Sequence, residues 1–321
     1  MPSTEGIFQF MSESSESSLY RNSKVKMIRL ENGDTGGSEG VELTAQALPI
    51  VDAREAAVAP TCERNGFELL DAPLEQKNDF LDHKSVVLDY YPLCEALVAN
   101  VTGATAYAFD HNIRSASGQA NKAAINEGQN VQGPAHVVHG DYTLQSAPDR
   151  LAQLGLPPSG NDTLRGVLPA DQALLPKDIE GKRYAIINVW RNIVDEPVVT
   201  HPLALCDAQT VDPDELVVFE IHYTDRIGEN YFAKHAESHR MYYYPEMTKD
   251  EALLIKQWDS AGALAQSNGE QGDAAKPDAP CTFSFHSAFD DPSTPEDAPD
   301  RWSIEVRCMV IYDDEVSLTY P

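Results

Sequence analysis

Two histidines in this chain are each followed, two positions later, by a carboxylate. His139 and Asp141 follow the apolar run AHVV, whereas His235 and Glu237 lie in a densely charged segment. On an extended strand, side chains two positions apart point to the same side, so such a pair can take adjacent positions on one metal ion. We expect His139 and Asp141 to form part of a metal site at the end of a strand, and His235 to lie on the surface.

A third histidine and a run of arginines lie far along the chain. His286 belongs to the segment CTFSFHSAF, and an arginine-containing run follows it at residues 301–307. If that run is a strand, Arg301, Ser303, Glu305 and Arg307 share one face, and apolar residues alternate on the other. This pattern predicts an anion bound inside a barrel. We also expect His286 and Arg301 to lie on neighbouring antiparallel strands joined by an acidic loop.

Four more residues are candidates for contact with a substrate: Arg114, Tyr142, Trp190 and Arg191. The two arginines interrupt strand-like segments, so they either face the same cavity as the metal or pair with one of the many carboxylates. Tyr142 and Trp190 either line the mouth of the site or fill the core. His136 and His222 fit a strand surface and a structural position, respectively, and neither is expected to be a ligand.

Short runs rich in β-branched and aromatic residues follow one early helical segment. At least seven such runs lie beyond residue 103, separated by turn-forming stretches. The pattern predicts a mainly β protein with helical support, a double-stranded β-helix of the jelly-roll, cupin-like type. We expect an extended, partly ordered arm over residues 1–45 and a single catalytic domain over 46–321.

Two segments have apolar residues at helical spacing. Residues 78–100 contain Pro92, which predicts a kinked helix or two short ones. Residues 247–260 place Glu251 three positions after Thr248, the pattern of a capping box, and so predict a second helix.

The composition excludes several classes of partner. The 321 residues include 51 Asp and Glu against 24 Lys and Arg, a formal net charge of −27, which repels nucleic acid and anionic membrane surfaces. No apolar run is long enough to span a bilayer, and the first residues lack the pattern of a signal peptide, so we expect a cytoplasmic protein. The five cysteines are scattered without a CxxC pair, which favours buried free thiols.

Three long segments carry a family resemblance: residues 188–207, 242–260 and 286–307. With His139, Asp141 and His286, they resemble the AsaB-type hydroxylase/desaturase family of Fe(II)/2-oxoglutarate-dependent oxygenases, which includes the CmcJ-like proteins. The chain is further similar to fungal ring-expanding, tropolone-forming dioxygenases.

The resemblance implies a role for each candidate. His139, Asp141 and His286 would be the two histidines and one carboxylate that hold Fe(II) and leave positions open for a keto-acid and O₂. Arg301 would bind the remote carboxylate of 2-oxoglutarate, with Ser303 completing the contact and Arg307 secondary.

We therefore expect a dioxygenase of specialised metabolism, fungal and acting on a polyketide or similar small molecule. The outcome would be hydroxylation, desaturation or ring expansion, and the protein could form a homo-oligomer. The alternatives are a metal-dependent cupin dioxygenase or isomerase without 2-oxoglutarate, which would not need the pair Arg301 and Ser303, and a non-catalytic jelly-roll binding protein.

Overall fold

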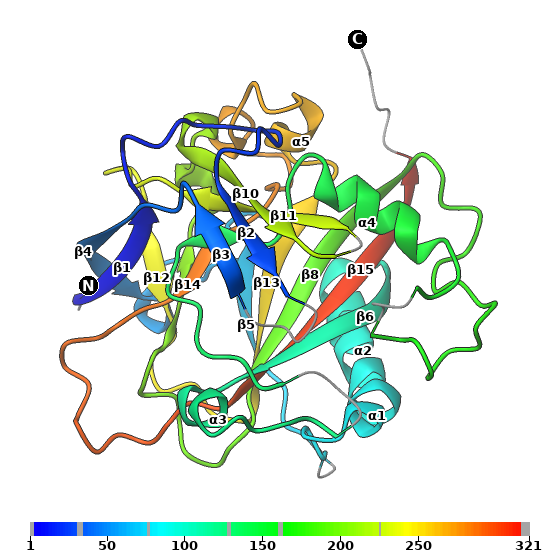
Figure 1. Ribbon diagram of the computed structural model, residues 1–321, viewed down its shortest axis with the longest axis horizontal. Coiled ribbons are helices and arrows are strands. Elements are labelled where there is room, and N and C mark those ends of the chain that lie inside the picture. The colour runs from blue at the N-terminus through cyan, green and yellow to red at the C-terminus, as the bar shows by residue number, and fades with distance from the viewer. Residues whose placement is uncertain are drawn as a thin grey trace.

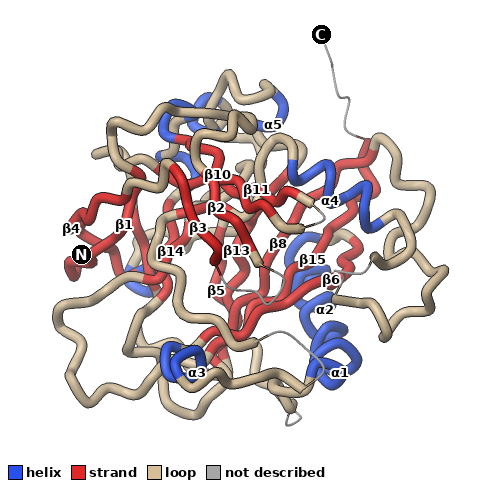
Figure 2. The backbone as a smooth tube through the Cα atoms, viewed as in Figure 1, coloured by secondary structure: helices blue, strands red, loops and turns tan. Residues whose placement is uncertain are grey.

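Two β-sheets form the framework of the protein and lie one in front of the other in Figure 1. The computed structural model describes residues 3–30, 35–75, 78–126, 130–159, 163–224 and 226–315. The short helices lie around the sheets, and long loops connect the strands (Figure 2). Side chains from both sheets line one pocket, so the two sheets face each other across it.

In the described residues the larger sheet has ten strands, and the strands that carry His139 and His286 lie near its middle. In spatial order the strands are β1 (Ser3–Met11), β4 (Leu43–Asp52), β12 (Met241–Tyr243), β9 (Leu203–Cys206), β14 (His286–Ala288), β7 (His139–Gly140), β11 (Ile227–Ala233), β10 (Leu216–His222), β2 (Lys26–Arg29) and β3 (Thr35–Glu39). Since β1 pairs with β4 along its whole length, residues 3–11 are part of this sheet. The division of the chain at residue 45 stays a prediction.

The smaller sheet has five strands and carries the arginine run. In order these are β5 (Phe67–Asp71), β13 (Glu251–Asp259), β8 (Lys182–Asn192), β15 (Ser303–Glu315) and β6 (Thr105–Arg114). The outer side of β15 presents Ile304, Val306 and Cys308, which are buried in the main hydrophobic cluster. Helix α2 (Tyr91–Thr102) packs against β15, β6 and β8. From Ser303 to Cys308 the predicted alternation holds, with the polar side chains toward the other sheet and the apolar ones toward the helix.

The helical segment before β6 consists of three consecutive pieces. It begins as α1 (His83–Ser85), passes through a π-helical turn (Val86–Tyr90) and continues as α2. Pro92 lies in the first turn of α2, just after the π-helical turn, and Gly103 ends the helix with φ of 68°. The remaining helices are α3 (Ala116–Ala120), α4 (Ser146–Leu154) and α5 (Ala263–Gln266), with 3₁₀ turns at Ala53–Glu55, Ala208–Thr210, Pro213–Glu215 and Asp273–Ala275.

The prediction of a helix over residues 247–260 is wrong, because residues 251–259 form β13. This strand pairs with β5 on one side and β8 on the other, and eight of its nine residues are buried. A strand covered on both faces is a continuous apolar run, which periodicity cannot distinguish from a helix. The contact predicted for a capping box does occur, since the Thr248 N–H donates to Glu251 Oε2 at 2.9 Å, but it closes a turn before the strand.

The expectation that His286 and Arg301 lie on neighbouring strands is also wrong. Strand β14 pairs with β7 and β9 in the larger sheet, whereas β15 begins at Ser303 in the smaller sheet. The loop over residues 289–302 therefore crosses from one sheet to the other, and Arg301 precedes the strand. This crossing places the arginine and the histidine on opposite walls of one pocket.

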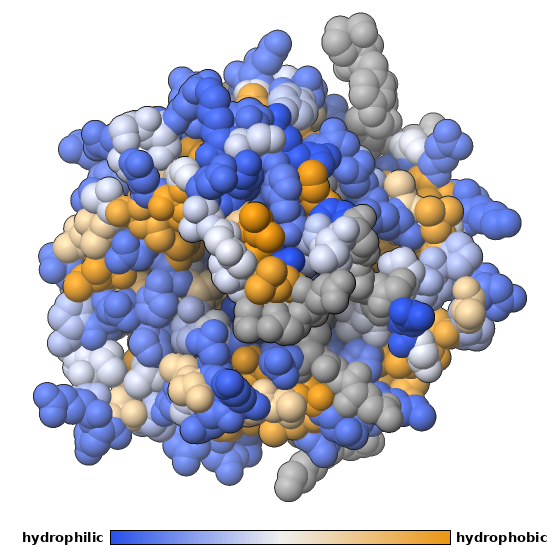
Figure 3. Space-filling view, in the orientation of Figure 1, coloured by the Kyte–Doolittle hydropathy of each residue, from blue (hydrophilic) through white to orange (hydrophobic). Residues whose placement is uncertain are grey.

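The surface is mostly polar and the cysteines are buried, as the composition indicates. The face shown in Figure 3 is mostly hydrophilic, with small apolar patches between polar residues. All five cysteines are buried and free, and burial raises the pKa of Cys62, Cys94 and Cys206 to about 12. Among the helices of the described ranges, none has the length and apolar character needed to cross a bilayer.

Candidate metal centre

Strand pairing brings His139, Asp141 and His286 together. His286 on β14 lies directly opposite His139 on β7, an antiparallel pairing that sets neighbouring side chains about 5 Å apart. The two imidazole rings have centroids 4.3 Å apart, and His139 Nε2 lies 3.6 Å from Asp141 Oδ1. One ligand atom from each of the three residues falls within 4.8 Å of the others. Gly140, between His139 and Asp141, leaves little room for a side chain, since an added Cβ would lie 3.1 Å from the ring of Phe283.

Both histidines are held as neutral imidazoles. Burial, reinforced by the neighbouring His286, lowers the pKa of His139 to about 4, and burial also lowers the pKa of His286. Nδ1 of His139 lies 2.7 Å from the carbonyl oxygen of Val137, so Nδ1 carries the proton and Nε2 offers its lone pair. Two neutral imidazole nitrogens beside a carboxylate are the donor set that a divalent iron prefers.

Asp141 is kept ionised and oriented by neighbours on the opposite sheet. Burial alone would raise its pKa, but Arg307 and the two histidines lower it below the ordinary range. Arg307 donates to Asp141 Oδ2 from Nε at 3.3 Å and from Nη2 at 3.2 Å, and Asn188 Nδ2 donates to the same oxygen at 3.2 Å. With Oδ2 occupied in this way, Oδ1 is left to face His139.

The register of the smaller sheet explains this network. Arg307 on β15 lies opposite Asp110 on β6 and opposite Asn188 on β8. Its guanidinium donates to Asp110 Oδ2 at 3.1 Å and to Asn112 Oδ1, and its Nη2 lies 3.6 Å from Glu305 Oε1. All three nitrogens of Arg307 are thus engaged. Arg307 therefore contacts Asp141 and lies beside Glu305, the pairing that its strand neighbour allowed, and its secondary part in binding a keto-acid stays a prediction.

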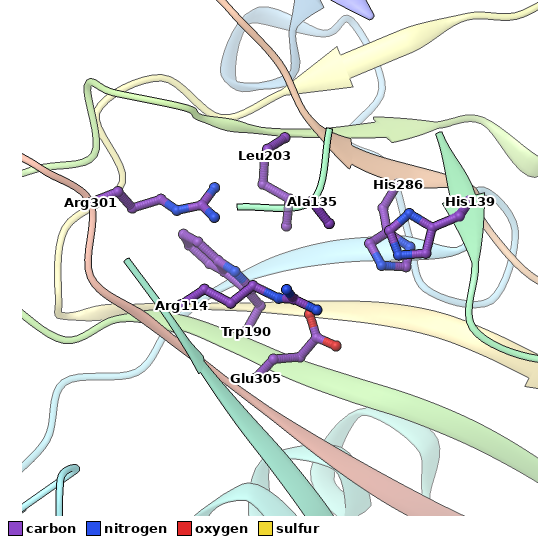
Figure 4. A pocket seen from close by; sticks show the side chains of 9 residues that line it. Arg114, Ala135, His139, Trp190, Leu203, His286, Arg301 and Glu305 are labelled. Carbon is purple, nitrogen blue, oxygen red and sulfur yellow. The ribbon is translucent and has the colours of Figure 1, made fainter. Parts of the chain in front are cut away.

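A pocket adjoins the three candidate ligands, and two arginines enter it (Figure 4). Its lining consists of Arg114, Ala135, His139, Trp190, Leu203, His286, Ala288, Arg301 and Glu305. The guanidinium groups of Arg114 and Arg301 both extend into the space between the two sheets in this view. The larger sheet contributes the histidines, and the smaller sheet contributes the charged and aromatic groups.

Arg301 is buried without a carboxylate bonded to it in the described part of the chain. Its Nη1 donates to the carbonyl oxygen of His201, and its side chain lies over Trp190, 5.8 Å from the ring centroid. Burial and the nearby Arg114 lower the pKa of Arg301 to about 9. Its Nε and the Oγ of Ser303 are both buried and have no hydrogen-bond partner among the described residues. Such unpaired donors are costly unless a ligand satisfies them, so this end of the pocket is suited to an anion.

Arg114 and Glu305 complete the charged wall of the pocket. Arg114 Nη1 donates to the carbonyl oxygen of Gly133 at 3.0 Å, and burial lowers the pKa of this arginine. Burial and the neighbouring Asp141 raise the pKa of Glu305, whose Oε1 accepts from Asn188 Nδ2 at 2.7 Å. Since Asn188 bonds both Glu305 and Asp141, it links the anion end of the pocket to the metal end.

Of the other predicted substrate contacts, Trp190 is at the pocket, whereas Tyr142 and Arg191 are not among the residues that line it. Trp190 lines the pocket, and Tyr142 is buried in the hydrophobic core. Arg191 does not face the pocket, because it follows Trp190 on β8 and therefore points to the opposite side of the sheet. There it bonds the hydroxyl of Tyr90 and the carbonyl oxygens of Ala72 and Lys249. Arg191 is a structural residue, a correction to its predicted place at the site.

The remaining histidines lie outside this cluster. His235 contacts Phe10, with ring centroids 5.3 Å apart, and His222 bonds Glu220 at 2.8 Å. The sequence-based analysis missed Asn188 and Gln257, whose Oε1 accepts from the Asp141 N–H at 3.1 Å. The sequence does contain a sign of Asn188, because it is a polar residue within the apolar run YAIINVW. It lies two positions before Trp190, so both side chains point to the same face of the strand.

Comparisons with known proteins support a specific family. The family model described as YDMC, Oxidoreductase/YMDC permease-like domain, matches residues 8–311. The hydroxylase/desaturase poxK of Penicillium oxalicum is 30% identical over 83% of this chain and 79% of its own length. The Fe(II)/2-oxoglutarate-dependent dioxygenase nvfI of Aspergillus novofumigatus is 32% identical over 71% of this chain and 68% of its own. The chain belongs to the hydroxylase/desaturase family of Fe(II)/2-oxoglutarate-dependent oxygenases.

A solved structure of this family shares the fold. The iron and alpha-ketoglutarate-dependent endoperoxidase NvfI superposes with a TM-score of 0.68 at 22% identity and covers 97% of this chain and 98% of its own. The predicted family, jelly-roll fold class and oxidoreductase class are confirmed, and the family's cofactors are Fe(II) and 2-oxoglutarate, as predicted. The closer similarity to ring-expanding enzymes stays a prediction.

Proposed function

We propose that this protein is a non-haem Fe(II)/2-oxoglutarate-dependent dioxygenase of specialised metabolism in which His139, Asp141 and His286 hold the iron. The observation that carries the proposal is the pocket itself, in which two neutral imidazoles and an oriented carboxylate lie beside buried arginine and serine donors without a partner among the described residues. When bound, Fe(II) with 2-oxoglutarate and O₂ supplies an oxidant strong enough to remove a hydrogen atom from an unactivated carbon.

The protein groups around the ligands set their geometry and charge. The carbonyl of Val137 fixes the tautomer of His139, and Arg307 with Asn188 fixes the rotation of Asp141. Outer contacts of this kind are needed because a metal site is only as well ordered as the groups that hold its ligands. His139 and His286 sit on paired strands, and Asp141 follows β7 directly.

The second part of the proposal assigns the anion end of the pocket to the remote carboxylate of 2-oxoglutarate. Arg301 Nε and Ser303 Oγ are two of the buried side-chain donors that have no hydrogen-bond partner among the described residues. A permanently charged guanidinium and a hydroxyl match a carboxylate in charge and in hydrogen bonding. A metal-dependent cupin without 2-oxoglutarate would have no use for this pair, so the pocket favours the keto-acid-dependent function.

The substrate is proposed to be a small molecule such as a polyketide, oxidised with O₂ to a hydroxylated, desaturated or ring-expanded product. The relatives named hydroxylase/desaturase support the first two outcomes. The five buried free thiols favour a reducing compartment such as the cytoplasm. Assembly into a homo-oligomer remains part of this proposal.

The test is the formation of succinate. Anaerobically Fe(II)-loaded protein is mixed with 2-oxoglutarate and a panel of small scaffolds, and O₂ is then admitted. We expect substrate-stimulated succinate formation that disappears in His286→Ala and is strongly reduced in Arg301→Ala. Full turnover in His286→Ala, or turnover of a substrate without 2-oxoglutarate, would contradict the proposal.

A further inference from the structure

A second cluster of two histidines and one aspartate lies outside the site described above. It consists of His136, His201 and Asp290, and one ligand atom from each lies within 4.8 Å of the others. Nδ1 of His201 and Nδ1 of His136 lie 3.3 Å and 3.7 Å from Asp290 Oδ1. Ligands bound about 2.0–2.1 Å from a tetrahedral Zn²⁺ are about 3.3 Å apart. The three side chains therefore already have the spacing of a metal site.

Main-chain contacts hold two of these residues against strand β1. Asp290 exchanges backbone hydrogen bonds with Ile7, at 3.0 Å and 3.3 Å, and the carbonyl of His136 accepts from the Gln9 N–H at 3.4 Å. Because both residues are fixed to one strand, their separation is set by the sheet and does not depend on the long loop that follows Asp290.

The third residue is held by an uncommon backbone conformation. His201 has φ of 46°, a left-handed conformation that a residue with a side chain adopts only when its surroundings require it. Its carbonyl oxygen accepts a hydrogen bond from Arg301 Nη1, which contributes to that requirement. The conformation places the imidazole edge-on to that of His136, with ring centroids 5.0 Å apart and planes at 87°.

We propose that His136, His201 and Asp290 form a second cation site that binds a divalent transition metal of the Zn²⁺ class. Two imidazoles and one carboxylate are a common ligand set for such ions, and the half-exposed position leaves a fourth place for water. The site shares no residue with the proposed iron centre. The net charge of −27 further favours the approach of a cation.

A simple ion pair between protonated histidines and Asp290 explains the cluster less well. Both imidazoles face the same oxygen, Asp290 Oδ1, and the 3.7 Å separation from His136 Nδ1 is longer than a hydrogen bond. A bound cation would satisfy both imidazoles and the carboxylate at once, whereas a single proton cannot.

The test isolates the second site and titrates it with Zn²⁺. The parent is the double variant His139→Ala/His286→Ala, free of affinity tags, in which the proposed iron ligands are removed. Calorimetric titration should show one equivalent of bound Zn²⁺. Adding Asp290→Asn should weaken that binding at least about tenfold, since even groups that only orient ligands change metal affinity by about 10–100-fold. Adding His201→Asn should do the same, and asparagine tolerates the left-handed backbone.

The matched control is His222→Ala in the same parent. His222 is exposed to the same degree as His136 and His201 and also lies beside a carboxylate, Glu220 at 2.8 Å, but it belongs to no three-residue cluster in the described part of the chain. It should leave the Zn²⁺ affinity unchanged. Absence of the single equivalent in the parent, or unchanged affinity in both Asp290→Asn and His201→Asn, would overturn the proposal.

A crystallographic measurement decides the question if any of these variants fails to fold. Crystals of the unaltered protein soaked in Zn²⁺ should give an anomalous peak at the zinc edge among His136, His201 and Asp290. No peak there would refute the second site. Zn²⁺ at His139, Asp141 and His286 alone would likewise count against it.

Discussion

Arg307 and Arg301 differ in how their hydrogen-bond donors are used. Arg307 bonds Asp141, Asp110 and Asn112, so all of its nitrogens are occupied. Arg301 has a carbonyl partner at Nη1 but no partner for Nε within the described residues. A ligand carboxylate can therefore gain hydrogen bonds from Arg301 without breaking any that hold the protein together.

Replacing Arg301 by alanine should weaken 2-oxoglutarate binding with little effect on iron. Truncating one partner of a buried charged pair costs about 2–5 kcal/mol, or roughly 30-fold and more in affinity. Anaerobic calorimetry of Fe(II)-loaded protein with 2-oxoglutarate measures this loss. Ser303→Ala should give a smaller loss, of about 1.5–3 kcal/mol, because it removes one hydrogen bond to a charged group. An unchanged affinity in Arg301→Ala would remove Arg301 from the anion site.

Asn188 acts on the metal through Asp141 and should affect iron affinity. Asn188→Ala removes the amide that donates to both Asp141 and Glu305. We expect Fe(II) to bind about 10–100-fold more weakly, as measured by competition with a chelator under anaerobic conditions. The control is Asn192→Ala on the same strand, whose amide bonds the carbonyls of Glu196 and Met247 instead. Equal iron affinity in the two variants would show that Asn188 does not position the ligand.

At the scale of elements, strand β13 carries a buried ion pair that links stability to pH. Lys256 Nζ lies 3.0 Å from Asp259 Oδ2, and Arg183 Nη2 donates to the same oxygen at 2.6 Å. Burial would raise the pKa of Asp259, but Lys256 and Arg183 lower it overall. A carboxyl group whose folded pKa is lowered stabilises the fold above its unfolded pKa of about 3.9, and that stability is lost as the pH falls through the folded pKa.

Asp259→Asn should therefore destabilise the protein at pH 7, by about 3–5 kcal/mol for a broken buried pair, and by less as the pH falls below about 4. Urea unfolding at pH 7, 5, 4 and 3 measures the difference between the two proteins. Asp313→Asn is a suitable control, because Asp313 is fully exposed and lies 3.9 Å from Lys182. A destabilisation by Asp259→Asn that stays constant from pH 7 to 3 would be inconsistent with this assignment.

The elements and the site were predictable from the sequence to different degrees. His139 and Asp141 could be predicted because strand alternation is local: side chains two positions apart point to the same side, whatever the rest of the fold. His286 could be chosen because it closes a strand-like run, but its place beside His139 could not be derived locally, since the pairing of β14 with β7 is set by the whole sheet. The role of Arg307 could not be read from its own strand, because its partners Asp110 and Asn112 come from β6.

The error at β13 has a similar origin. Residues 251–259 are buried on both faces, so the period of two that marks a half-exposed strand is absent. The neighbours that cover both faces are distant in sequence, and nothing within the segment reveals them. For Arg191 the sequence does contain a local signal: Arg191 and Trp190 are adjacent on one strand, so their side chains point to opposite faces and only one of them can line the pocket.

At the scale of the whole molecule, the charge of −27 should oppose the folded state through self-repulsion. Raising NaCl from 10 mM to 150 mM shortens the screening length from about 30 Å to about 8 Å. We expect the Tm to rise by about 1–3 °C, corresponding to roughly 1 kcal/mol in a chain of this size. Calorimetry in chelator-treated buffer measures the change. A Tm that falls with added salt would mean that local ion pairs outweigh the overall repulsion.

The central claim is that one pocket holds Fe(II) on His139, Asp141 and His286 and 2-oxoglutarate on Arg301 and Ser303. The most direct test is a crystal structure of the protein grown anaerobically with Fe(II) and 2-oxoglutarate. We expect an anomalous iron peak bonded to those three residues, with the remote carboxylate of 2-oxoglutarate hydrogen-bonded to Arg301 Nε and Ser303 Oγ. Iron bound elsewhere, or 2-oxoglutarate absent from the Arg301 end of the pocket, would contradict it.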